Sequence, residues 1–329
     1  MGRGRTIRKY LAGRMLSAAG TFFVLATLLF ILFRLVPGDP TLTVLSPALS
    51  PEVQADLRQR FGLDQPMAVQ YALYLGNIVT AHFGTSFGRG VPVVDLLGER
   101  VVNTLILMLP ALVLAYGLGI AGGALIAWKR GSRLERSVTL FAIMFRAAPV
   151  FWICIVFIAV FSIRLGLFPS GHMLTPGAGA SEGLGQYLSL DFVHHLALPL
   201  IVMTLYYGCY PLLVMRTSML EVLGDDFIDL CKAKGLSEGR VVFRHALRAS
   251  LLPIATSVSL LAAYAVAGSV LVEAVFSWPG VGRLMVEAVL DSDYPVAQAA
   301  FLLIALLTVL GNLAADMLYG FIDPRIRHS

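Results

Sequence analysis

Three glycines in the first half of the chain have the spacing of a nucleotide-binding loop. Gly117, Gly119 and Gly122 match GxGxxG, which in dinucleotide-binding proteins follows a strand and precedes an acidic residue by about 20 positions. Here the pattern lies inside an apolar run, and the acidic residue at that distance, Glu135, lies in a basic loop. Gly119 and Gly123 also have the GxxxG spacing that lets membrane helices pack closely, so we favour a packing role.

The sequence lacks the motifs of an ATP-binding loop and of a zinc protease. It contains no GxxxxGK[ST] loop for ATP and no HExxH pattern. His194 and His195 are adjacent, but neighbouring residues of a helix point about 100° apart, which suits shared metal ligation poorly. Cys154, Cys209 and Cys231 lack the spacing of a zinc site or a disulfide framework. We therefore expect no catalytic residue, no metal site and no cofactor bound by this chain.

One arginine lies deep inside an apolar run. Arg146 is placed roughly 13 Å into a predicted membrane span, at about 1.5 Å per helical residue. A charge at such a depth indicates a functional site that faces a cavity or an acidic partner, and Asp316 in the last apolar run is nearest in depth. The alternative is an arginine that extends to the nearer membrane surface. Arg146 and Asp316 are our candidate residues for a translocation path.

The stretch from Glu221 to Pro253 is rich in charged residues, in a chain that is 14% charged. A helix is predicted from Asp226 to Lys234, with Phe227, Leu230, Cys231 and Lys234 on one face. Gly235 supplies the left-handed residue that ends it, and Ser237 is predicted to cap a second helix that runs to Pro253. A charged pair of helices between apolar runs indicates a docking surface for a soluble partner.

These residues belong to a chain that is too apolar for a soluble globular protein. Of its 329 residues 57% are hydrophobic, and the mean hydropathy is +0.79. We expect an all-α membrane protein with six transmembrane helices, each about 20 residues or longer. The predicted spans are Leu11–Leu35, Val101–Trp128, Val138–Ile163, Leu196–Met215, Leu251–Val272 and Val296–Gly320.

The distribution of lysine and arginine predicts the orientation of these spans. Most of the lysines and arginines lie in the N-terminal segment, the loop after the second span, the charged loop of residues 216–253 and the C-terminal tail. Because basic loops stay in the cytoplasm, both termini and the charged loop are predicted to be cytoplasmic. The net charge of +5 therefore reflects membrane topology and not a nucleic-acid partner.

The chain is predicted to divide at residue 100. Residues 1–100 hold the first span and an extracytoplasmic segment with short amphipathic helices at Ser50–Phe61 and Pro66–Ala81, which lie on the membrane surface or under a partner. Residues 101–329 form a five-helix membrane core that contains the charged loop. Phe168–Asp191 is a further outer loop, and Ser277–Gly282 is a tight turn.

Six short motifs, in order along the chain, resemble one family of transport proteins. This family comprises the membrane-spanning subunits of binding-protein-dependent ABC importers, in the peptide and nickel class and of the first-subunit type. The resemblance covers nearly the whole chain, and the joint occurrence of the motifs is more specific than any one of them. The motifs are Arg34–Pro40, Phe61–Pro66, Phe83–Ser86, Val275–Leu284, Asp293–Pro295 and Asp323–Arg327.

The resemblance implies a type I ABC importer permease fold in the cell inner membrane. A second homologous permease would complete the pathway as a heterodimer, with two ATPase subunits that bind ATP and Mg, and with an extracytoplasmic substrate-binding protein. The loop around Gly235 would dock an ATPase subunit. Its predicted contact residues are Asp226, Asp229, Leu230, Cys231, Lys232, Ala233, Lys234, Gly235, Leu236, Ser237, Arg240, Arg244 and His245.

Two segments depart from the family pattern. Asp229-Leu230-Cys231 replaces the Glu-Ala-Ala of general importers, and Arg146 stands where small residues are expected before Pro149. The resemblance implies di- or oligopeptides as the solute, with nickel, glutathione or another small solute as the alternatives. The other classes of function that remain are an ATP-independent channel or secondary carrier, and a membrane scaffold or receptor without a transport role.

Overall fold

The computed structural model describes residues 3–35, 65–177, 183–254 and 269–322. In these residues the chain is helical, and the one β-type contact is an isolated bridge between Thr85 and Pro92. This confirms the predicted all-α class for the described residues.

Four helices of the described residues are long and apolar enough to cross a membrane. They are α1 (Arg3–Leu35), α5 (Val93–Trp128), α8 (Leu190–Val222) and α14 (Tyr294–Ile322), and they confirm the first, second, fourth and sixth predicted spans. The fifth predicted span, Leu251–Val272, lies largely outside the described residues, although residues 251–254 and 269–275 are helical. A total of six spans therefore stays a prediction.

The third predicted span is not one continuous helix. α6 (Arg133–Ala147) and α7 (Val150–Phe157), which continues as the π-helix η1 (Ile158–Arg164), meet at an angle of 108°. Pro149 precedes α7, and Ala148 before it is extended. A proline disfavours the helical conformation of the residue before it and has no N–H to donate. The predicted third span, Val138–Ile163, is therefore bent at Ala148 and Pro149, and its crossing of the membrane as one span stays a prediction.

α5 and α8 form the best-packed pair of helices, and glycines make their close approach possible. A Cβ on Gly119 would lie 2.8 Å from the carbonyl oxygen of Gly208, and one on Gly123 would lie 2.5 Å from that of Leu212. The packing role predicted for these glycines is confirmed. The main apolar cluster, which includes Leu107, Met203 and Trp278, extends from this interface.

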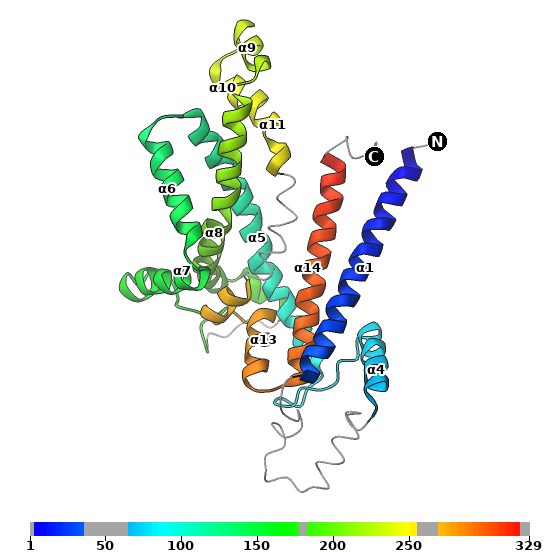
Figure 1. Cartoon of the computed structure of the whole chain (residues 1–329). Coiled ribbons are helices and arrows are strands. Elements are labelled where there is room, and N and C mark those ends of the chain that lie inside the picture. Colours follow the sequence, from blue (N-terminus) through cyan, green and yellow to red (C-terminus); the bar gives the residue numbers. More distant parts are fainter. Residues whose placement is uncertain (1–2, 36–64, 178–182, 255–268, 323–329) are drawn as a thin grey trace.

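The helices divide the molecule into two ends (Figure 1). α9 (Asp226–Ala233), α10 (Glu238–Arg240), η3 (Val241–Ala246) and α11 (Leu247–Ala249) lie at the end where α1 begins and α14 finishes. α4 (Met67–Thr80) and α13 (Val281–Leu290) lie at the opposite end, and α1 packs beside α14. η2 (Gly183–Leu188), a 3-10 helix, precedes α8.

α4 confirms the helix predicted at Pro66–Ala81. Its C-cap residue, Ala81, has a φ of +54°. The helix predicted at Ser50–Phe61 lies outside the described residues. The division of the chain at residue 100 stays a prediction.

A buried carboxylate holds the turn predicted at Ser277–Gly282. Glu273 is fully buried and accepts hydrogen bonds from the hydroxyl of Thr104 (2.8 Å) and from the backbone N–H groups of Gly282 (2.7 Å) and Arg283 (3.2 Å). Gly282 and Arg283 are in the first turn of α13, where unpaired N–H groups and the helix dipole favour a negative charge. Glu273 thereby ties the turn to α5 and to the start of α13.

Candidate functional site

The first helix of the charged loop, α9, is held by one buried side chain. α9 begins after a turn that follows α8, and Ile228 is its one buried residue, with no exposed surface. Ile228 packs with Met215 and Met219 of α8 and with Val241 and Val242 of η3. A single apolar anchor lets the remaining side chains of α9 stay in solvent. Ile228 was not singled out from the sequence, because this residue lies off the helix face that was predicted from Phe227, Leu230, Cys231 and Lys234.

Gly235 ends α9 with the left-handed geometry predicted for it. Its φ is +74°, and its N–H donates to the carbonyl of Lys232 (2.9 Å). The helix itself ends at Ala233, one residue earlier than predicted, with Lys234 as its C-cap. Residues with a Cβ rarely adopt this backbone conformation, so Gly235 fixes the direction in which the chain leaves α9.

The predicted contact residues remain accessible to a partner. Leu230 exposes 56% of its surface and Phe227 exposes 39%, although both are apolar. Asp229 and Lys232 form an exposed ion pair at 3.0 Å, and such pairs add little to stability. Cys231, Leu236 and His245 are half-buried, and the other predicted residues, Asp226, Ala233, Lys234, Gly235, Ser237, Arg240 and Arg244, are exposed.

The second helical segment is held differently from the prediction. Ser237 occupies the N-cap position, but its side chain accepts no capping hydrogen bond. Instead the carboxylate of Glu238 accepts a hydrogen bond from the indole N–H of Trp128 (2.9 Å), at the end of α5. The ring of Trp128 also meets the ring of Phe243 edge-on, with centroids 5.5 Å apart. This segment continues through η3 and α11 to residue 254 with a turn at Ser250.

A buried ion pair holds α6 against α8 at the same end. The carboxylate of Glu135 accepts hydrogen bonds from Nε (2.9 Å) and a terminal nitrogen of Arg216, and from the N–H of Gly131 (2.6 Å). The hydroxyl of Ser132 accepts from the N–H of Glu135 and caps α6. The charged loop is thus fastened to α5 through Trp128, and α8, which leads into it, is fastened to α6 through Arg216.

This arrangement can transmit a movement of α9 to the long helices. Ile228 joins α9 to α8 and η3, and the contacts of Trp128 and Arg216 join these elements to α5 and α6. Because packed interfaces of this kind move as units, a force on α9 would displace the helices together.

Arg146 lies in the last turn of α6, beside the bend at Pro149. Its guanidinium carbon is 5.0 Å from the centroid of the Tyr206 ring on α8, and the side chain is half-buried. Among the described residues no ion pair to Arg146 is found. Asp316 lies in α14 with its side chain outside the described residues, so their proximity stays a prediction.

The adjacent histidines point to different partners. A ring nitrogen of His194 is 2.9 Å from the carbonyl of Leu167, and one of His195 is 2.9 Å from the carbonyl of Asp191. In the part of the chain that the structure describes, no group of three or more His, Cys, Asp or Glu residues could hold a metal ion.

Comparison with protein families gives one consistent match. Residues 119–328 match the family described as binding-protein-dependent transport system inner membrane component, and residues 7–108 match its N-terminal family. The chain is 37% identical to the oligopeptide transport system permease protein AppB of Bacillus subtilis, covering 97% of this chain and 99% of that protein. It is 38% identical to the di/tripeptide transport system permease protein DppB of Pseudomonas aeruginosa, covering 97% and 98%. It is 37% identical to the dipeptide transport system permease protein DppB of Escherichia coli, covering 94% and 95%.

Proposed function

This chain belongs to the family of binding-protein-dependent transport system inner membrane components, and we propose that it forms half of a pathway for peptide import. The observation that carries the peptide assignment is the similarity of nearly the whole chain to three permeases named for peptides. A binding protein outside the membrane delivers the peptide, and a second, homologous permease completes the pathway as a heterodimer.

The energy for import comes from two ATPase subunits, which bind ATP and Mg. α9 contacts one of them through Phe227, Leu230 and its exposed charges, which places both termini and the charged loop in the cytoplasm of the cell. Closure of the ATPase pair on ATP pushes α9, and the attached helices move between inward-open and outward-open packings. The exposed apolar side chains of α9 and the positive φ of Gly235 support this proposal.

Substitution at Gly235 tests the coupling. Gly235→Val places a β-branched residue at φ +74°, which costs about 1–3 kcal/mol of strain. Peptide-stimulated ATP hydrolysis and peptide uptake by the reconstituted importer are expected to fall by about 5- to 150-fold, the factor to which this strain corresponds. Gly239→Val is the matched control, since an added Cβ there meets no atom within 4 Å and the backbone is helical. Unchanged hydrolysis and uptake in Gly235→Val would disprove the coupling role of the loop.

The same reconstituted system tests the solute and the class of transporter. Labelled di- and oligopeptides are expected to accumulate when ATP and the binding protein are present. Uptake of nickel or glutathione in preference to peptides would assign a different solute. Uptake without ATP would identify a channel or secondary carrier, and no uptake of any solute would favour a scaffold or receptor.

Arg146 is proposed to line the path, because it is a half-buried cation at the bend between α6 and α7. Arg146→Ala should lower uptake while the subunits still co-purify, since the side chain would act on the passing solute. Loss of uptake and of assembly in equal measure would mean that Arg146 has a structural role. Asp316 is retained as its proposed partner in the path.

A further inference from the structure

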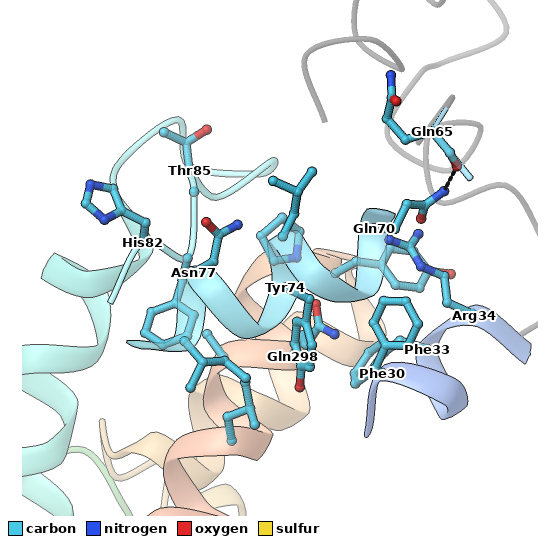
Figure 2. A pocket seen from close by; sticks show the side chains of 18 of the residues that line it. Phe30, Phe33, Arg34, Gln65, Gln70, Tyr74, Asn77, His82, Thr85 and Gln298 are labelled. Atoms are coloured by element: carbon cyan, nitrogen blue, oxygen red, sulfur yellow. Dashed lines mark hydrogen bonds between the residues drawn. The ribbon is translucent and has the colours of Figure 1, made fainter. Parts of the chain in front are cut away.

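Residues of α1, α4 and α14 line a groove (Figure 2). It lies at the end of the molecule opposite α9, where α4 is placed (Figure 1). Its volume is about 780 Å³, which is within the range of ligand pockets. Phe30 and Phe33 of α1 and Leu302 of α14 provide apolar walls. The polar side chains that line it include Gln70, Asn77 and Gln298. The proposed transport function uses none of these residues.

The contacts of α4 place the groove beside the membrane-spanning part of α1. The hydroxyl of Tyr74 donates to the carbonyl of Ala26 (3.0 Å), and the hydroxyls of Tyr71 and Thr27 are 2.7 Å apart. Phe30 packs against both tyrosine rings. Ala26 is roughly 12 Å along the helix from Arg34, at about 1.5 Å per residue, so α4 packs against the part of α1 that is apolar enough to cross a membrane, residues 12–34.

The rim of the groove is apolar and exposed. Val69 and Leu73 line it, yet expose 42% and 52% of their surfaces. Ile31 and Leu32, in the adjacent turn of α1, are exposed as well. Exposed apolar side chains beside a membrane-length helix favour contact with acyl chains, and such a rim would let a lipid enter without crossing a polar surface.

Arg34 is the one permanently charged side chain among the described residues that line the groove. Its guanidinium carbon lies 5.4 Å from the centroid of the Phe30 ring, and no carboxylate of the described residues pairs with it. Figure 2 shows Arg34 and Gln70 together at one end of the groove, with Phe30 and Phe33 next to them. A half-buried guanidinium is a strong partner for phosphate, which it binds by charge-assisted hydrogen bonds.

We propose that this groove binds an anionic phospholipid, with the phosphate on Arg34 and an acyl chain along Phe30, Phe33 and Leu302. Charge complementarity favours an anion, and the opening between Val69 and Leu73 favours an amphiphile from the bilayer. The lipid fills the space between α4 and the α1–α14 pair. This site is independent of the transported solute and of which side of the membrane this end faces.

The test measures lipid binding by the assembled importer after delipidation. Phosphatidylglycerol and phosphatidylcholine are titrated separately, and bound lipid is counted by native mass spectrometry. The wild-type complex is expected to bind phosphatidylglycerol more tightly. Arg34→Gln should weaken phosphatidylglycerol about tenfold and remove the preference, because it removes hydrogen bonds to a charged group. Arg164→Gln is the matched control, since Arg164 is also in the last turn of a helix but does not line the groove.

A second pair of variants tests the apolar part of the groove. Val69→Trp should fill the groove and prevent binding of both lipids. Val79 is on the same helix, is 86% exposed and does not line the groove, so Val79→Trp should leave the binding of both lipids unchanged. Inorganic phosphate at millimolar concentration should not displace the lipid. Displacement by phosphate would show a simple anion site and overturn the proposal. An unchanged lipid preference in Arg34→Gln would overturn it too. So would cross-linking from position 69 to residues 36–64 or to the binding protein in place of lipid.

Discussion

Single polar side chains determine the geometry of the end of the molecule opposite α9. Glu273 accepts hydrogen bonds from Thr104 and from the first turn of α13, and the hydroxyl of Thr104 in turn accepts from the N–H of Val281 (2.9 Å). The carboxylate of Asp293, also buried, accepts from the hydroxyl of Ser86 and from the N–H groups of residues 87 and 88. A buried carboxylate is tolerated where several donors surround it, and both residues meet this condition.

Glu273→Gln should therefore destabilise the protein although the shape of the side chain is kept. An amide NH2 replaces one of the two accepting oxygens and faces donors, so at least one buried hydrogen bond is lost. The expected loss is about 1–3 kcal/mol of unfolding free energy, which appears as a lower thermal unfolding midpoint of the purified complex. Glu99→Gln, at an exposed position, should leave the midpoint unchanged. An equal midpoint for Glu273→Gln and wild type would contradict the role given to this carboxylate.

At the scale of helices, glycine permits the close approach of α8 to α5, and proline interrupts the helix between α6 and α7. Gly119 and Gly123 let α8 approach α5, whereas Gly117 and Gly122 of the same segment have more space. Pro149 turns the predicted third span through 108°. The close packing of α5 could be predicted from the GxxxG spacing of Gly119 and Gly123, because this spacing places both glycines on one face of the helix. The bend was missed because the run of apolar residues continues through Ala148 and Pro149 without interruption.

Gly123→Ala is expected to force α5 away from α8. The added Cβ would lie 2.5 Å from the carbonyl oxygen of Leu212 and 2.7 Å from the Cβ of Met215, and such overpacking costs about 1–3 kcal/mol. The yield of monodisperse complex in size-exclusion chromatography and its thermal midpoint should both fall. Gly117→Ala is the control, since its Cβ meets nothing within 4 Å. If both variants behave alike, close packing of α5 on α8 does not limit stability.

At the scale of the whole molecule, the two ends present different surfaces. One end presents α9 with its exposed apolar and charged side chains, and the other holds the groove and the turn around Glu273. The proposed orientation, with α9 in the cytoplasm, depends on the distribution of lysine and arginine and on the proposed ATPase contact.

Thiol labelling tests this orientation directly. In a background without Cys154, Cys209 and Cys231, single cysteines are placed by Ser237→Cys near α9 and by Asp291→Cys after α13, both at exposed positions. A membrane-impermeant maleimide should label position 291 in spheroplasts and position 237 in inverted membrane vesicles. The reverse pattern would place α9 outside the cell and exclude its contact with ATPase subunits.

The sequence by itself determined the helical class, four membrane-length helices, α4 and the left-handed end of α9. These depend on hydrophobic periodicity and on glycine, which act over a few neighbouring residues. Only the tertiary structure decided the partners of Glu273, Asp293, Trp128 and Arg216, and the groove beside Arg34. Thr104 and Glu273 are 169 positions apart, and Ser86 and Asp293 are 207 apart. Contacts over such separations depend on how the helices pack together, and no local pattern of residues specifies that packing.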